Sequence, residues 1–119
     1  MKRLVNLRLH EGPFVYIGRP GKGQAGPYGN PYAVGEKCGR CGHWHAGGRS
    51  TLPCYAAYLE ERTAKDPAFR VLLLDAKRRV AGGTPLGCFC AGKHGLDVDD
   101  HPWTCHGQPL LFWLDRLET

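Results

Sequence analysis

The pattern of apolar and polar positions predicts two strands near the start of the chain. Residues 4–9 (LVNLRL) alternate apolar and polar side chains, as a strand with one buried face does. Residues 13–19 (PFVYIGR) are rich in aromatic and β-branched side chains, which favours a second, well-buried strand. Residues 18–53 then show no periodicity, over a length that is uncommon for a structureless loop in a compact domain. We therefore expect something other than an apolar core to order that segment.

Two helices are predicted to follow this irregular segment. Residues 50–53 (STLP) offer a hydroxyl cap and a proline for the first turn of a helix that continues to Lys65. Asp66 and Pro67 repeat the same start for a second helix, which the glycines at 82–83 end. The apolar positions of the second helix recur at helical spacing, at Phe69, Leu72, Leu73, Ala76 and Val80.

A third strand and a last helix complete the predicted elements. Residues 84–90 (TPLGCFC) are short and apolar, and the alternation of a strand turns Leu86, Cys88 and Cys90 to one face. Residues 105–118 (CHGQPLLFWLDRLE) predict a helix with an apolar stripe. The order of elements predicts a small α/β or α+β domain, in which a short sheet of about three strands is covered by about three helices.

The length and net charge of the chain indicate how many domains it forms and which partners it favours. A chain of 119 residues suits a single domain over residues 1–119. Its formal net charge of +5 favours anionic partners, either a nucleotide-like small molecule or nucleic acid. The alternative is that this charge serves only solubility, because the basic residues are scattered rather than gathered in a stripe.

The start of the chain and its cysteines suggest a compartment. Residues 1–10 (MKRLVNLRLH) lack the continuous apolar core of a signal peptide, and no stretch approaches the ~20 apolar residues that a membrane span requires. We therefore expect a cytoplasmic protein without a membrane partner. In that setting the six cysteines serve more often as thiols or metal ligands than as disulfides.

The first cysteine cluster predicts a zinc site. Cys38 and Cys41 have the Cys-x-x-Cys spacing at which a tight turn presents two thiolates to one tetrahedral ion. Cys54, in the first turn of the predicted helix, and His45 complete a three-cysteine, one-histidine set, with His43 as the substitute for His45. The alternatives are a buried thiol cluster or a redox pair, although a redox Cys-x-x-Cys normally opens a helix. We expect a structural zinc ion that braces residues 36–54 as an insertion in the domain.

A second constellation lies at the end of the chain. Cys88 and Cys90 are near the carboxyl end of the third predicted strand, and Cys105 and His106 precede the last helix. Ligands of open α/β sheets bind beyond the carboxyl ends of the strands, so Arg19, Cys90, Cys105 and His106 are expected to converge on one crevice if the second and third strands are neighbours. Cys88 is expected to be a core residue and Cys105 the more reactive thiol. A second metal site is the alternative.

Several motifs of the chain, in their order, resemble a family found in bacteria and phages. The motifs are VYIGRP at 15–20, GNPY at 29–32, YxxYL at 55–59, LGCFC at 86–90 and CHG at 105–107. The family is a domain of unknown function, and the resemblance spans nearly the whole chain. It implies a compact α/β domain and places Arg19, Asn30, Cys90, Cys105 and His106 on motif positions. Gln108 stands where an acidic residue often follows the Cys-His-Gly of that family.

Two functions are consistent with these residues, and the sequence leaves open whether the protein is an enzyme. In the first, the crevice binds a nucleotide: Arg19 holds its phosphate, Asn30 and Cys90 contact it, and Cys105 or His106 acts as nucleophile or acid–base group. In the second, the zinc-braced segment is a nucleic-acid or protein-binding module without catalysis. Its cations and Trp44 then resemble the stacking surfaces of single-strand binders.

Overall fold

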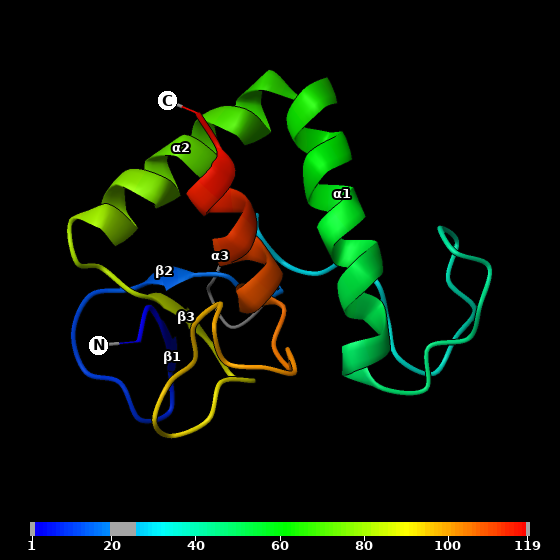
Figure 1. Cartoon of the computed structure of the whole chain (residues 1–119), viewed down its shortest axis with the longest axis horizontal. Coiled ribbons are helices and arrows are strands. Elements are labelled where there is room, and N and C mark those ends of the chain that lie inside the picture. The colour runs from blue at the N-terminus through cyan, green and yellow to red at the C-terminus, as the bar shows by residue number, and fades with distance from the viewer. Residues whose placement is uncertain (1, 20–25, 119) are drawn as a thin grey trace.

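The sheet of this protein is parallel and has three strands. A computed structural model describes residues 2–19 and 26–118 of the chain (Figure 1). Within these ranges β1 (Leu4–Asn6), β2 (Val15–Tyr16) and β3 (Leu86–Cys88) form a sheet in the order β1-β3-β2. Both outer strands run parallel to β3, so β2 and β3 are neighbours as the crevice hypothesis requires. The predicted α/β class is confirmed.

The strands are shorter than the patterns predicted. The strand expected over residues 4–9 ends at Asn6, because a tight turn begins there. The carbonyl oxygen of Asn6 accepts hydrogen bonds from the backbone N–H groups of Leu9 and His10, and its side-chain oxygen accepts one from Arg8. An asparagine that binds its own backbone in this way favours a turn over a strand.

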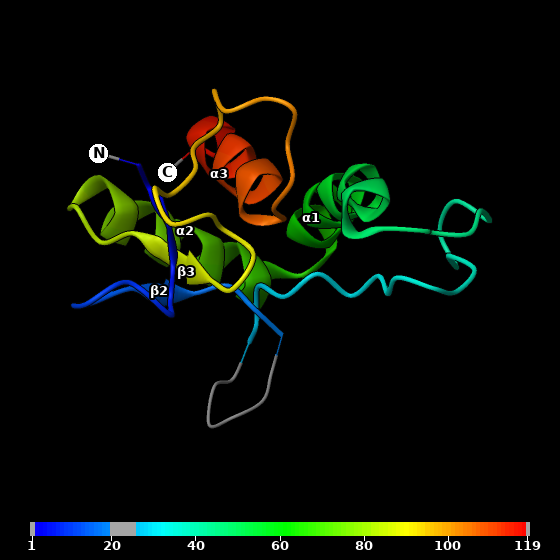
Figure 2. The same ribbon diagram turned by 90° about the horizontal axis from the view of Figure 1, so that it is seen from below.

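Three helices lie on one side of the sheet in the described ranges (Figure 2). They are α1 (Leu52–Lys65), α2 (Pro67–Ala81) and α3 (Gly107–Arg116), and a short 3-10 turn, η1 (Gly48–Thr51), precedes α1. The predicted start of α2 is confirmed, since the Asp66 carboxylate accepts hydrogen bonds from the N–H groups of Ala68 and Phe69. The hydroxyl cap expected for α1 is absent. Thr51 instead donates to the carbonyl oxygen of Gly48 and accepts from the Asn30 side chain.

The start of α3 packs directly on the sheet because residue 107 is glycine. A Cβ atom at Gly107 would lie 2.5 Å from the Cδ1 atom of Leu4 and 2.8 Å from that of Ile17. This contact brings the two residues before the helix, Cys105 and His106, to the carboxyl ends of β2 and β3. The glycine of the Cys-His-Gly motif therefore positions the two residues that precede it.

Gln108 ties the loop before α3 to the helix. Its fully buried side chain accepts hydrogen bonds from the N–H groups of Thr104 and Cys105, and donates to the carbonyl oxygens of Asp97 and Asp100. The amide thus uses both donors and both acceptor positions. A carboxylate in this position would keep the acceptors but would have no N–H to offer the two carbonyl oxygens.

Candidate functional site: two cysteine clusters and a crevice

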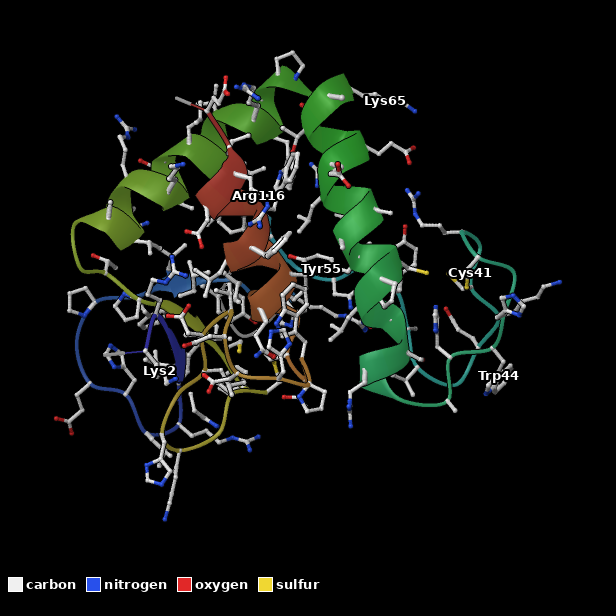
Figure 3. All side chains as sticks on the ribbon, viewed as in Figure 1. Lys2, Cys41, Trp44, Tyr55, Lys65 and Arg116 are labelled. Atoms are coloured by element: carbon white, nitrogen blue, oxygen red, sulfur yellow. A yellow bond between two sulfur atoms is a disulfide. The ribbon has the colours of Figure 1, made fainter. Side chains whose placement is uncertain are left out.

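The segment before α1 forms a small hairpin that extends away from the body of the domain (Figure 1). Lys37 and Trp44 form an antiparallel bridge, and the N–H of Cys38 donates to the carbonyl oxygen of His43. Gly42 occupies the turn with a positive φ of 76°, which favours glycine. Figure 3 shows Cys41 and Trp44 on this hairpin, whereas Tyr55 lies in the interior.

The hairpin and the start of α1 bring four metal-ligating side chains together. The ligand atoms of Cys38, Cys41, His45 and Cys54 all lie within 4.8 Å of one another. The sulfur atoms of Cys38 and Cys54 are 3.8 Å apart, and the Cys41 sulfur is 3.8 Å from Nε2 of His45. In a tetrahedral zinc site, bonds of about 2.3 Å to sulfur and 2.0 Å to nitrogen separate such pairs by about 3.8 and 3.6 Å. This cluster could hold a metal ion.

The histidine in the cluster is His45, not His43. His45 is buried, and its Nδ1 lies 2.9 Å from the hydroxyl oxygen of Ser50. That hydroxyl donates its proton to the carbonyl oxygen of Gly47, so it accepts the Nδ1 proton of His45. The unprotonated Nε2 therefore faces the sulfur atoms. A histidine that ligates a metal is usually oriented by such a bond from its other ring nitrogen. His43 is exposed on the hairpin.

The backbone of the hairpin also favours a thiolate at Cys38. The N–H groups of Cys41 and Arg40 donate to the Cys38 sulfur, and these hydrogen bonds lower the pKa of that thiol to about 6. Burial acts in the opposite direction at Cys54 and raises the pKa of its thiol. A metal ion binds cysteine as thiolate. The hairpin therefore favours the thiolate form of Cys38 before the ion binds, whereas Cys54 becomes a thiolate when the ion binds.

The second cysteine cluster joins β3 to the start of α3. The sulfur of Cys88 lies 3.3 Å from that of Cys90 and 3.2 Å from that of Cys105, and a disulfide links Cys90 to Cys105. Cys88 and Cys105 are buried, and Cys90 is exposed. Cys105 is as buried as Cys88, and Gln108 accepts hydrogen bonds from the N–H groups of Thr104 and Cys105. The greater reactivity expected of Cys105 stays a prediction. The catalytic roles of Cys105 and His106 stay predictions.

His106 lies beside this second cluster. Its Nε2 is 2.6 Å from the carbonyl oxygen of Ile17, and its Nδ1 is 3.6 Å from the Cys90 sulfur. A carbonyl oxygen only accepts, so Nε2 carries the proton and Nδ1 has a lone pair that faces Cys90. Burial lowers the pKa of His106, the hydrogen bond to Ile17 opposes this shift, and the positive charge of Arg19 adds to it.

A cavity of about 170 Å³ lies at the carboxyl ends of β2 and β3, but Cys105, which the crevice hypothesis included, is not among the residues that line it. Four residues from separate sequence motifs line it: Arg19, Asn30, Cys90 and His106. Arg19 donates hydrogen bonds to the carbonyl oxygens of Asn30 and Tyr32, and neither bond involves its Nη1. Asn30 donates to the hydroxyl of Thr51. The crevice therefore has a cation whose position is fixed by the backbone around it.

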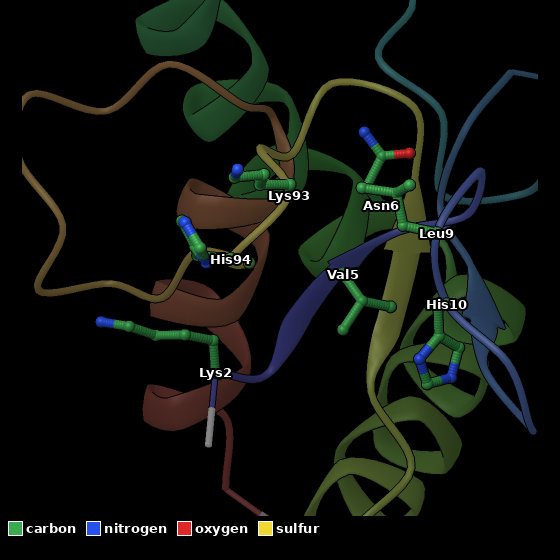
Figure 4. Close-up of a pocket in the computed structure, with 8 residues that line it drawn as sticks. Lys2, Val5, Asn6, Leu9, His10, Lys93 and His94 are labelled. Carbon is green, nitrogen blue, oxygen red and sulfur yellow. The ribbon is translucent and has the colours of Figure 1, made fainter.

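A second cavity, of about 200 Å³, lies between β1 and the loop after β3 (Figure 4). Its lining includes Lys2, His10, Lys93 and His94. No sequence signal points to this site, because these basic residues belong to no motif and come together only in the folded chain. Lys2 is partly neutralised there by a salt bridge of 2.8 Å to Asp100.

These features define a small, cysteine-rich α/β domain with two clusters of metal-ligating side chains. The sequence matches the model of the family described as Domain of unknown function (DUF4326) over residues 5–116. The chain therefore belongs to this family. A search of curated proteins and a search of solved structures each found no match. In the described part of the chain, none of the helices is long and apolar enough to cross a membrane.

Proposed function

We propose that this chain is a zinc-stabilised domain that binds a small phosphate-bearing ligand, of the nucleotide class, in the crevice beside β2 and β3. The observation that carries this proposal is the convergence of Arg19, Asn30, Cys90 and His106 on one cavity. They come from four segments that are far apart in the sequence. Polar residues that served only to fasten loops would have no need to share a cavity.

The position and the chemistry of the crevice support an anionic ligand. It lies at the carboxyl ends of parallel strands, where open α/β sheets bind their ligands. Arg19 supplies a guanidinium group that two backbone carbonyl oxygens hold in place, which lowers the entropic cost of binding a phosphate. The volume of about 170 Å³ is below the ~300 Å³ at which pockets for drug-sized ligands begin, so it suits one part of a nucleotide, such as its phosphate.

Zinc is the metal that we propose for Cys38, Cys41, His45 and Cys54. Three thiolates and one imidazole in tetrahedral spacing are typical of structural zinc sites. Four protein ligands leave no position for a substrate, so this ion would brace the hairpin and take no part in chemistry. Any catalysis would fall to residues of the crevice.

A second candidate function is suggested by Trp44, which is 65% exposed on the hairpin. An exposed tryptophan next to cations could stack on a base of single-stranded nucleic acid. Arg40 is less available for this purpose, since it pairs with Glu61 and Tyr32. We therefore place this function second.

The test is a thermal-shift series with nucleoside mono-, di- and triphosphates, the matching nucleosides and pyrophosphate. The crevice predicts that a phosphate-bearing compound raises the melting temperature, and that Arg19→Ala folds but loses this response. Lys93→Ala, which removes a cation from the other cavity, is the matched control and should keep it. A ligand at a hundred times its Kd stabilises by about 2.7 kcal/mol, which the assay resolves.

Three results would contradict the proposal. The first is the absence of any response to phosphate-bearing compounds, and the second is a response that Lys93→Ala loses and Arg19→Ala keeps. The third is salt-sensitive binding of single-stranded oligonucleotide that Trp44→Ala abolishes, with no response to nucleotides. This last result would favour the hairpin as the functional surface.

A further inference from the structure

We infer that the reduced chain has a second metal site, formed by Cys88, Cys90, Cys105 and His106, which binds zinc or a similar thiophilic divalent ion. It shares no ligand with the hairpin cluster, and it does not depend on the proposed anionic ligand. Each ligand comes from the end of β3 or the residues before α3, so the ion would join the sheet to the last helix.

The sulfur atoms carry the first part of this inference. The three thiol sulfurs lie within 4.8 Å of one another, and Cys88 is 3.3 and 3.2 Å from the other two. Thiolates around one tetrahedral ion are about 3.8 Å apart. The Cys88 sulfur therefore has to move about 0.5 Å away from each of the other two, and the sulfurs of Cys90 and Cys105 separate further once the disulfide between them is reduced. Core packing alone gives no reason for three cysteines from two segments to meet at their sulfur atoms.

His106 supplies the fourth ligand through its contact with Cys90. The ligand atoms that lie within 4.8 Å of one another are those of the three cysteines, so the His106 ring has to move toward the other two sulfurs when the ion binds. The bond from its Nε2 to the carbonyl oxygen of Ile17 fixes the tautomer that leaves Nδ1 unprotonated. Nδ1 is 3.6 Å from the Cys90 sulfur, which is the spacing of about 3.6 Å that a tetrahedral zinc ion imposes on a thiolate and an imidazole. His45 is oriented in the same manner by Ser50 at the hairpin cluster. The two histidines thus share one arrangement, in which a backbone or hydroxyl oxygen holds the nitrogen that does not bind the metal.

The disulfide between Cys90 and Cys105 and the metal ion use the same two sulfur atoms. Metal binding therefore requires the reduced chain. A phosphine reductant supplies the two electrons and is oxidised to the phosphine oxide, while a water molecule supplies the oxide oxygen and the protons of the two thiols. Both thiols release their protons to solvent when they bind the ion as thiolates. Because Cys90 and His106 also line the crevice, the ion would add positive charge to its wall.

The experiment is a metal titration of the full-length protein, reduced with a phosphine and kept free of oxygen. Wild type is expected to bind two equivalents of Zn²⁺ with high affinity. Cys88→Ser combined with Cys90→Ser should retain only the hairpin equivalent, and Cys38→Ser combined with Cys41→Ser only the second one. Co²⁺ serves as a spectroscopic probe of the second site in the variant that lacks Cys38 and Cys41. Adding His106→Gln to that variant should change the visible absorption of the bound Co²⁺.

Alkylation of the wild-type protein gives a second measurement that does not depend on the folding of variants. Cys90 is the exposed thiol of the second cluster, so it should be labelled rapidly in the reduced, metal-free protein. Added Zn²⁺ should slow this labelling at least tenfold, and a chelator should restore it. A single equivalent of Zn²⁺ in reduced wild type, or labelling of Cys90 that Zn²⁺ leaves unchanged, would overturn the inference.

Discussion

The sulfur atoms of Cys38 and Cys54 lie 3.8 Å apart, although 16 residues separate the two cysteines in the chain. This contact joins the hairpin to the first turn of α1. Both residues are buried, yet most of the hairpin around them is exposed. Apolar burial therefore contributes little to holding the hairpin, and a metal ion is the interaction that would order it.

Replacement of His45 should release the metal from the hairpin. We expect His45→Ala to lose one equivalent of zinc, and the amides of residues 36–54 to exchange hydrogen much faster, while the amides of α2 and α3 stay protected. Hydrogen exchange read by mass spectrometry, together with metal analysis, measures both effects. His43→Ala is the matched control, since His43 is exposed and outside the cluster. Equal loss of zinc in both variants would refute the assignment of His45.

Replacement of Gln108 by glutamate, which has nearly the same shape, should destabilise the fold. Gln108→Glu keeps the shape of the side chain but removes the two N–H donors to the carbonyl oxygens of Asp97 and Asp100, and it places a negative charge against them. We expect a loss of about 2–4 kcal/mol in the free energy of unfolding. Urea denaturation measures the loss, with the exposed exchange Glu60→Gln as the control. A loss below about 0.5 kcal/mol would contradict this account of the loop.

Elements with a local chemical signature could be predicted from the sequence. The start of α2 is an example, since Asp66 binds N–H groups two and three residues ahead, within one short segment. The hairpin cluster is another, because Cys-x-x-Cys encodes most of its geometry within one turn. The choice between His43 and His45 could not be made in this way. It depends on the hydrogen bond of His45 to Ser50, whose hydroxyl is oriented by Gly47.

The features that the sequence analysis missed depend on long-range contacts. Thr51 has the side chain of a helix cap, but Asn30, 21 residues earlier, binds its hydroxyl instead. Cys105 lies in a polar stretch of sequence and is nevertheless buried, because Gln108 holds the backbone around it. In both cases a residue distant in the sequence or buried in the fold, Asn30 for Thr51 and Gln108 for Cys105, determines the environment of the side chain.

Gly107 should be required for the close packing of α3 on the sheet. Gly107→Ala would place a methyl group 2.5 Å from the Cδ1 atom of Leu4, so the helix start or the strand must move. We expect the free energy of unfolding to fall by about 1–3 kcal/mol, as for other overpacked cores. We also expect weaker metal binding at the proposed second site, because Cys105 and His106 would shift with the helix start. Gly92→Ala is the control, since a Cβ atom there would meet no described atom within 4 Å. Thermal denaturation of the two variants distinguishes a packing effect from a general cost of replacing glycine.

Stability in acid should depend on Asp97, which binds Arg3 at the start of β1. The Arg3 guanidinium donates to both oxygens of this carboxylate, and these hydrogen bonds lower its pKa to about 2. A lowered pKa in the folded state means that the unfolded chain takes up the proton first as the pH falls. The stabilisation is therefore complete above about pH 4, the ordinary range for aspartate, and is lost as the pH falls through about 2.

We expect this pair to contribute about 1–2 kcal/mol at neutral pH, after allowance for screening of the partly exposed guanidinium by solvent. Asp97→Asn should remove that contribution at pH 7 and flatten the decline of stability between about pH 4 and 2. Urea denaturation at a series of pH values measures both effects. Asp99→Asn is the matched control, because Asp99 is largely exposed and lies 3.9 Å from Lys2, too far for a strong pair. A pH profile that Asp97→Asn leaves unchanged would show that other carboxyl groups govern the acid sensitivity of the fold.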